Sequence, residues 1–142
     1  MPETFDLTEF LPYALNRASE AAGQGFSAVY KSRNGMLSTE WRVLVHLGRF
    51  GEMTARQICD RAGLHKTKVS RAVKALEGRR FLLRSERPDD RRQDALCLTP
   101  AGKAAYLDLS KRAQAYDAAL AAQFNAEELD VLRRCLRQLA GL

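Results

Sequence analysis

The spacing of apolar and polar residues predicts a mainly helical chain. Apolar spacing, alanine content and capping residues predict six helices, at about residues 8–30, 39–47, 54–62, 66–76, 100–124 and 127–139. The pattern changes after residue 80, where two short strand-like segments, 81–84 and 95–98, flank the polar turn-forming stretch 87–93. We therefore expect a mainly α fold with one small β-hairpin.

Capping and helix-breaking residues predict where the helices begin and end. Ser38 is expected to cap the second helix, Gly63 to end the third and Asn125 to cap the last. Thr99-Pro100 predicts a helix start, because threonine caps well and proline suits the first helical position. Asn34-Gly35 predicts a turn within a loop at 31–35.

The predicted helix at 66–76 has two unlike faces. At about 100° per residue, Val69, Val73 and Leu76 fall on one side. The other side and the N-terminal flank carry hydroxyl groups and long cations, namely Lys66, Thr67, Lys68, Ser70, Arg71 and Lys74. Such a face suits the major groove of DNA, where arginine bonds guanine edges and cations reach phosphates. The alternative for this helix alone is an ordinary basic face exposed to solvent.

Two neighbours of this helix favour DNA binding over that alternative. The short helix before it, joined through Gly63-Leu64, completes a helix-turn-helix. The hairpin turn after it carries Arg87, Arg91 and Arg92, and arginine at such a tip can enter a narrow minor groove. We therefore expect a winged helix-turn-helix whose DNA-reading segment is 54–98.

The positive charge of the chain is concentrated in the same region. The net charge is +6, from 23 basic and 17 acidic residues. The stretch 66–92 holds ten basic and four acidic residues, so the rest of the chain is neutral. A concentrated positive charge is typical of a protein whose partner is a polyanion such as double-stranded DNA.

Three stretches of the chain carry a family resemblance. They are LSTEWRVL at 37–44, GLHKTKVSR at 63–71, and PDDRR at 88–92 followed by LTPAG at 98–102. On these residues the chain resembles the MarR family of bacterial winged-helix regulators over nearly its whole length. The most specific match is the Asp-x-Arg of Asp90 and Arg92 before Leu-Thr-x-x-Gly. The resemblance implies that Arg92 enters the minor groove and that Asp90 braces it by a charge-assisted hydrogen bond.

The resemblance also implies an assembly. Members of the family are homodimers, so we expect a single domain, 1–142, in which helices within 1–35 and 100–142 dimerise and 38–98 forms the DNA-binding lobe. The apolar stripe expected at the interface is Leu129, Leu132, Leu136 and Leu139. An intramolecular core position is the alternative for this stripe. A two-fold dimer would present two reading helices to a palindromic operator.

Two residues depart from the family pattern. His65 stands where a better capping residue is usual, so either the reading helix begins less rigidly or His65 itself touches phosphate. Arg80 stands where glycine is usual. Either the helix ends early, near Gly78, or Arg80 adopts a left-handed conformation at some cost.

The function that the resemblance implies is that of a repressor released by a small effector, with an aromatic acid as the expected class. Effectors of the family bind between the dimerisation region and the DNA-binding lobes. The candidate residues there are Tyr13, Arg17, Tyr30, Trp41 and His46. Arg17 would pair with a carboxylate, and Tyr30 or Trp41 would stack on a ring. A purely structural role is the alternative for each of the five.

Other functions are less well supported by the sequence. Cys59, Cys97 and Cys135 are widely spaced and absent from the first helix, which favours free buried thiols over peroxide sensing. A winged helix that contacts proteins without DNA is a further alternative. No catalytic motif, metal-ligand spacing or cofactor fingerprint occurs, so we expect no enzyme, metal or cofactor. Without a signal peptide or an apolar run of about 18 residues, the expected location is the bacterial cytoplasm, on the nucleoid when bound to DNA.

Overall fold

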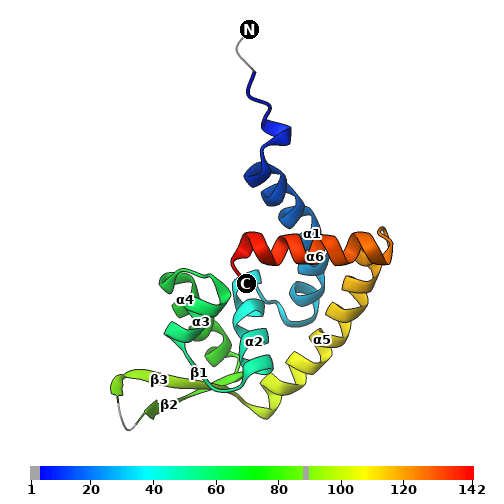
Figure 1. The fold of residues 1–142 in the computed structure, drawn as a ribbon. Coiled ribbons are helices and arrows are strands. Elements are labelled where there is room, and N and C mark those ends of the chain that lie inside the picture. Colours follow the sequence, from blue (N-terminus) through cyan, green and yellow to red (C-terminus); the bar gives the residue numbers. More distant parts are fainter. Residues whose placement is uncertain (1–3, 88–89) are drawn as a thin grey trace.

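The computed structural model describes residues 4–87 and 90–142, with the backbone alone for residues 86, 87 and 90–93. Within these residues the α-helices are α1 (Leu11–Asn34), α2 (Ser38–Phe50), α3 (Ala55–Ala62), α4 (Lys66–Gly78), α5 (Pro100–Ala121) and α6 (Ala126–Ala140). The strands are β1 (Met53–Thr54), β2 (Leu82–Arg87) and β3 (Asp90–Leu98). The expected fold class, mainly α with a β-hairpin wing, is confirmed (Figure 1).

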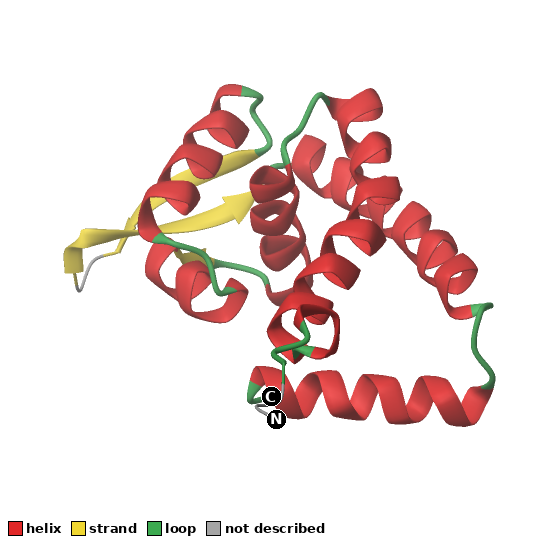
Figure 2. Cartoon of the chain, turned by 90° about the horizontal axis from the view of Figure 1, so that it is seen from above, coloured by secondary structure: helices red, strands yellow, loops and turns green. Residues whose placement is uncertain are grey.

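The elements divide into a compact lobe and a set of longer helices. The sheet, α2, α3 and α4 gather on one side of the molecule (Figure 1). Helix α5 leads away from the sheet, and α6 lies at the edge farthest from it (Figure 2). The N-terminal half of α1 extends beyond the rest of the molecule (Figure 1).

The sheet differs from the prediction in the length of its hairpin. Strands β2 and β3 pair antiparallel from Leu82 opposite Leu98 to Arg87 opposite Asp90, so only residues 88 and 89 separate them. The two predicted segments, 81–84 and 95–98, thus lie in a hairpin as expected, but its strands are longer than predicted, and the turn expected at 87–93 was wrong. The stretch is rich in residues that usually form turns, so the sequence pattern indicated a turn. In the structure its backbone N–H and C=O groups pair across the hairpin instead.

Strand β1 was not predicted. Met53 and Thr54 pair with Leu96 and Ala95 of β3, which makes β3 the central strand in the order β1-β3-β2. Two residues are too few to show the alternation that marks a strand.

The core lies between the sheet and the helices of the lobe. The apolar side predicted for α4 is confirmed, because Val69, Val73 and Leu76 are 0 to 2 % exposed. They pack with buried residues of α2, α3, the sheet and α5, among them Val43, Leu44, Ile58, Leu82, Leu96 and Leu109.

Helix α1 begins and ends later than predicted. Asp6 caps a single 3-10 turn, Leu7–Glu9, and α1 begins at Leu11 instead of near residue 8. The helix continues to Asn34, through most of the expected loop at 31–35. It ends there because Gly35 adopts the left-handed conformation, with φ of 60°, and its N–H donates to the Lys31 carbonyl at 2.8 Å.

The start of α2 also differs by one residue. Ser38 is the first residue of α2 and not its cap, and Leu37 occupies the N-cap position. The reason is the Glu40 carboxylate, which accepts the Leu37 N–H at 2.6 Å and so replaces a capping hydroxyl.

The other predicted caps are confirmed. Asn125 Oδ1 accepts the Glu128 N–H at the start of α6. Thr54, expected as the first residue of the third helix, is instead the N-cap of α3, and its Oγ1 accepts the Gln57 N–H. Gly63 ends α3 with φ of 66°. Thr99 caps α5 by accepting the Gly102 N–H at 3.0 Å.

Gly102 marks a close approach of two chain segments. A Cβ atom at this position would lie 2.0 Å from the carbonyl oxygen of Phe81. That oxygen also accepts the Thr99 N–H at 3.0 Å. The first turn of α5 therefore packs directly on the turn between α4 and β2. Only glycine fits at the last position of the Leu-Thr-x-x-Gly motif, because any Cβ atom there would collide with this turn.

Arg80 resolves one of the two departures from the family pattern. Both alternatives are confirmed, because α4 ends at Gly78 and Arg80 then adopts the left-handed conformation, with φ of 62°. The Phe81 N–H donates back to the Leu76 carbonyl at 2.9 Å, so the conformation closes a normal helix-ending turn that glycine would adopt without strain.

Replacing Arg80 with glycine is therefore expected to raise the free energy of unfolding by about 1 kcal/mol, because the left-handed strain is removed. Urea unfolding measures the change. Arg80→Ala is the matched control, since it removes the same side chain but keeps a Cβ atom at positive φ, and it should give no such gain. Equal stabilities of the two variants would contradict this explanation.

Helix α6 contributes no buried residue within this chain. Leu132, Leu136 and Leu139 are 39 %, 43 % and 58 % exposed, and Leu129 is half-buried. The intramolecular alternative for the leucine stripe is therefore wrong for its three more C-terminal members.

The cysteines are free, but the expectation that they are buried was wrong. Cys59 and Cys97 are half-buried and Cys135 is exposed.

Candidate nucleic-acid interface

Helices α3 and α4 form the predicted helix-turn-helix. Gly63 in the left-handed conformation turns the chain sharply after α3, and its N–H donates to the Cys59 carbonyl at 3.0 Å. Helix α4 begins three residues later at Lys66. The turn is thus short and closed by backbone hydrogen bonds, which fixes the direction in which α4 leaves it.

His65 caps α4. Its Nδ1 accepts the Thr67 N–H at 3.2 Å, so the neutral ring carries its proton on Nε2. The helix start is therefore held by a side-chain cap, and an exposed N–H donor stands beside the helix N-terminus. The cap argues against the first alternative, a less rigid start of α4. A contact between His65 and phosphate, the second alternative, stays a prediction.

The two faces of α4 are separated as predicted. Every residue of the predicted reading face is exposed, namely Lys66, Thr67, Lys68, Ser70, Arg71 and Lys74. Because the opposite face is fully buried against the core, α4 cannot rotate to hide these groups. The side chains thus form a fixed polar and cationic row.

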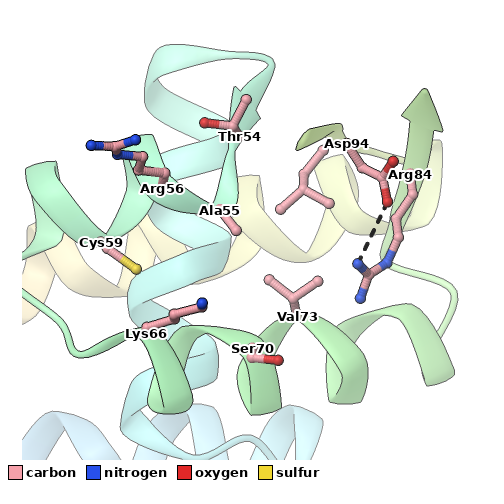
Figure 3. Close-up of a pocket in the computed structure, with 10 residues that line it drawn as sticks. Thr54, Ala55, Arg56, Cys59, Lys66, Ser70, Val73, Arg84 and Asp94 are labelled. Atoms are coloured by element: carbon pink, nitrogen blue, oxygen red, sulfur yellow. Dashed lines mark ion pairs between the residues drawn. The ribbon is translucent and has the colours of Figure 1, made fainter. Parts of the chain in front are cut away.

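A hollow separates α4 from the wing. It has a volume of about 540 Å³ and is lined by residues of β1, α3, α4, β2 and β3 (Figure 3). Lys66 and Arg84 lie at opposite ends of it, and the guanidinium of Arg56 points away from its centre (Figure 3). These three cations border the same concave surface as Ser70.

Arg56 and Arg84 were not among the predicted contact residues. Arg84 Nε lies 3.1 and 3.2 Å from the two carboxylate oxygens of Glu77 on α4, and its Nη1 lies 3.8 Å from Asp94 Oδ2 on β3. Arg84 thereby links the reading helix to both long strands of the wing. The charge count of 66–92 includes Arg84, but only the folded sheet places it beside α4.

The wing residues of the prediction lie at the far end of the hairpin. Arg87 is the last residue of β2, and Asp90, Arg91 and Arg92 begin β3, so none of the four stands in a loop as expected. Their side chains lie outside the described residues, as do Pro88 and Asp89 entirely. The proposed brace between Asp90 and Arg92 therefore stays a prediction.

The predicted effector residues do not converge on one place. Arg17 and Tyr30 border an open hollow on α1 of about 640 Å³, together with Ser38. Tyr13 and His46 are not among the residues that line it. His46 Nδ1 lies 2.6 Å from the Arg42 carbonyl oxygen.

Trp41 and Tyr30 belong to an aromatic cluster between α1, α2 and α5. Their rings stack at 6.1 Å between centroids, and Phe26 packs edge-on against both. Tyr116 of α5 adds a fourth ring and donates its hydroxyl to the Ala22 carbonyl at 2.5 Å. Burial raises the pKa of the Tyr30 hydroxyl, and a hydrogen bond with Ser38 opposes this. The side chains of this cluster therefore occupy much of the space in which the ring of an effector was expected to stack on Tyr30 or Trp41.

Within the described residues, no group of three or more His, Cys, Asp or Glu side chains could hold a metal ion. Across the same part of the chain, no helix is both long and apolar enough to cross a membrane.

Comparison with known proteins agrees with this geometry. The sequence model of the MarR family matches residues 34–93, which cover α2, the helix-turn-helix and most of the wing. An uncharacterised HTH-type transcriptional regulator of Bacillus subtilis (strain 168), YwoH, is 25 % identical over 103 residues, 72 % of this chain and 74 % of its own length.

Solved structures extend the similarity to the whole chain. A MarR/EmrR family transcriptional regulator from Acinetobacter sp. ADP1 is 27 % identical with a TM-score of 0.86, and 96 % of each chain is covered. BpsR of Bordetella bronchiseptica, whose DNA binding is regulated by 6-hydroxynicotinic acid, shares the fold with a TM-score of 0.83 at 20 % identity, and 99 % of each chain is covered.

Proposed function

Because this chain belongs to the MarR family of winged helix-turn-helix transcriptional regulators and is not an enzyme, we propose that it is a homodimeric repressor in the bacterial cytoplasm. In this proposal it binds a palindromic operator and is released by a small effector. The observation that carries the DNA-binding part is the exposed row of hydroxyl and cationic side chains on α4, fixed by a buried opposite face.

We assign the contacts by the chemistry of each group. Arg71 and Lys74, with Thr67 and Ser70, face the base edges of the major groove. Lys66 and Lys68, at the N-terminus of α4, reach backbone phosphates, where the helix dipole favours an anion. Arg87, Arg91 and Arg92 of the wing enter the adjacent minor groove.

Operator binding tests this proposal. A duplex carrying the DNA upstream of the protein's own coding region should bind more tightly than an unrelated duplex of equal length, by about 1000-fold at physiological salt. Equal affinities would contradict the proposed specificity. Absence of binding to either duplex would favour the alternative of a winged helix that contacts only proteins.

The dimer is proposed from apolar surface that this chain leaves exposed. The exposed leucines of α6 are joined by apolar residues at the N-terminus, which are Phe5, Leu7, Phe10 and Leu11, between 46 and 67 % exposed. Exposed apolar side chains in this number mark an interaction site, and a second copy of the chain offers the same side chains in return.

Replacing Leu136 with aspartate should shift the dimer toward monomer, because a charge in an apolar interface is costly to bury. Sedimentation equilibrium should show at least about a 100-fold weaker dimer, from a loss of about 3 kcal/mol. Leu83→Asp on β2 is the matched control, since Leu83 is 58 % exposed and lies in the DNA-binding lobe, outside both segments that are expected to dimerise. Equal effects of the two variants would count against this interface.

The proposed effector site includes only two of the five residues that the sequence analysis named as candidates. Of the five candidate residues, Arg17 and Tyr30 share the open hollow on α1, so a carboxylate is expected at Arg17. Arg17 is now paired with Glu20 at 3.8 Å on the surface, a weak pair that a ligand carboxylate can replace. BpsR, which shares the fold, is regulated by an aromatic acid.

Benzoate and its hydroxylated derivatives should therefore weaken operator binding by the wild type, and Arg17→Ala should bind the operator normally but lose this response. Titration of the operator complex with each acid measures both. An undiminished response of Arg17→Ala would show that the effector binds elsewhere.

A further inference from the structure

Arg79 joins the end of the reading helix to the corner between α1 and α2. It follows α4 directly, and its guanidinium donates to two backbone carbonyls, those of Asn34 and Gly35, the latter at 2.8 Å. Its Nε lies 3.9 Å from Oε1 of Glu40 on α2. One side chain thus contacts the last residue of α1, its C-terminal cap and the first turn of α2.

The partner carboxylate is held in place from the other side. Glu40 is only 5 % exposed, and its Oε2 accepts the Leu37 N–H at 2.6 Å. A buried carboxylate is costly unless it is paired and hydrogen-bonded, and Arg79 supplies the positive charge. Because both oxygens of Glu40 are engaged, the carboxylate cannot follow Arg79 if α4 shifts.

The backbone on each side of this contact is also fixed. Gly35 has φ of 60°, and a Cβ atom there would lie 3.4 Å from Nη2 of Arg79. Arg80, the next residue after Arg79, has φ of 62°. The turn at Arg80 therefore lies in a narrow allowed region for a residue with a Cβ atom, and the turn at Gly35 is held by the hydrogen bond from its N–H to the Lys31 carbonyl.

We propose that Arg79 is a positioning residue for DNA recognition, which fixes the orientation of α4 relative to α1. The apolar packing under α4 fixes which of its faces is buried, whereas the two hydrogen bonds and the ion pair of Arg79 tie the C-terminal end of α4 to the corner between α1 and α2. This rests on the proposed function, in which α1 belongs to the dimerisation region. In the dimer, Arg79 then sets the separation and the tilt of the two reading helices.

The consequence is a requirement for one half-site spacing. A dimer whose reading helices are fixed tolerates only one separation of the two half-sites, since the other spacings require the protein or the DNA to deform. A dimer in which Arg79 no longer holds α4 reads each half-site as before but accepts several separations.

The experiment compares operator duplexes whose half-sites are one base pair closer together, correctly spaced or one base pair farther apart. The wild type should prefer the correct spacing by about tenfold, and Arg79→Gln should lose most of that preference while its affinity for the correct operator falls by about tenfold. Arg79→Lys, which keeps the charge near Glu40 but cannot fork to two carbonyls, should fall between them.

Arg80→Gly is the matched control, because it removes the same charge one residue away and leaves the pairing of Arg79 with Glu40 intact. It should keep the spacing preference, and its affinity for non-specific duplex should equal that of Arg79→Gln. If Arg79→Gln fails to fold, as judged by circular dichroism, Glu40→Gln replaces it. That variant keeps an acceptor for the Leu37 N–H and removes only the charge.

A wild-type spacing preference that Arg79→Gln retains in full would overturn the positioning role and leave the proposed function standing. A wild type that binds no operator would overturn both.

Discussion

Replacing Arg71 with alanine is expected to weaken operator binding by about 1–3 kcal/mol per half-site, which the two copies in a dimer raise to about 2–6 kcal/mol. Arg71 is exposed in the middle of the polar face of α4, and the residue that follows it, Ala72, is only 2 % exposed. The backbone beneath Arg71 is therefore held by the core, and the substitution removes the guanidinium without moving the helix.

The measurement is fluorescence anisotropy of a labelled operator duplex at constant salt, with an unrelated duplex measured in parallel. Lys111→Ala is the matched control, since Lys111 is an exposed cation on α5, outside the expected DNA-reading segment 54–98. Arg71→Ala should lose specific affinity far more than non-specific affinity, and Lys111→Ala should change both little. Equal losses in the two variants would place base recognition elsewhere.

Replacing Gly102 with alanine is expected to lower the free energy of unfolding by about 3 kcal/mol. The added Cβ would lie 2.0 Å from the Phe81 carbonyl oxygen, and the obstacle is backbone, which cannot rotate away as a side chain does. Relief requires α5 to move off the turn between α4 and β2, which breaks the hydrogen bond from Thr99 N–H to Phe81.

Urea unfolding measures this change, and Gly23→Ala is its matched control. Gly23 lies in the middle of α1, and nothing stands within 4 Å of a Cβ placed there. Alanine in an exposed helix is favoured over glycine by about 0.5–1 kcal/mol, so the control should be slightly more stable than the wild type. A Gly102→Ala variant as stable as the wild type would mean that α5 and the turn separate freely.

The sequence predicted the parts of the fold that local patterns govern. The buried and exposed faces of α4 follow from the helical period alone, and Thr99 and Asn125 cap their helices as predicted because their side chains act on the next turn. The choice at Arg80 between an early helix end and a left-handed residue could be framed from sequence. Only the structure showed that both occur together, because α4 ends at Gly78 and the Phe81 N–H then bonds back to the Leu76 carbonyl across the left-handed Arg80.

The features that the sequence missed depend on residues distant in the chain. Strand β1 exists because Met53 and Thr54 meet β3 more than forty residues later, and two residues carry no pattern of their own. The hydrogen bonds of Arg79 to Asn34 and Gly35 span a similar distance. Arg84 borders the hollow beside α4 only because β2 folds back over that helix.

The same limit applies to the candidate site. The exposed row of hydroxyl and cationic side chains could be predicted from residue type and helical spacing, because all of its residues belong to one helix, α4. The five candidate effector residues come from two helices, and their packing sends Trp41 into an aromatic cluster and His46 to the Arg42 carbonyl. Their separation could not be predicted without the angle between α1 and α2.

The salt dependence of duplex binding tests the central claim, that the exposed face of α4 and the wing contact the DNA backbone. Each neutralised phosphate releases counterions, so a dimer that neutralises several phosphates should show a slope of log affinity against log salt of about −4 or steeper. In Lys66→Ala/Lys68→Ala, the slope should become shallower by about 1 for each phosphate that the variant no longer neutralises. A slope near zero for the wild type, or one unchanged in this variant, would contradict the account.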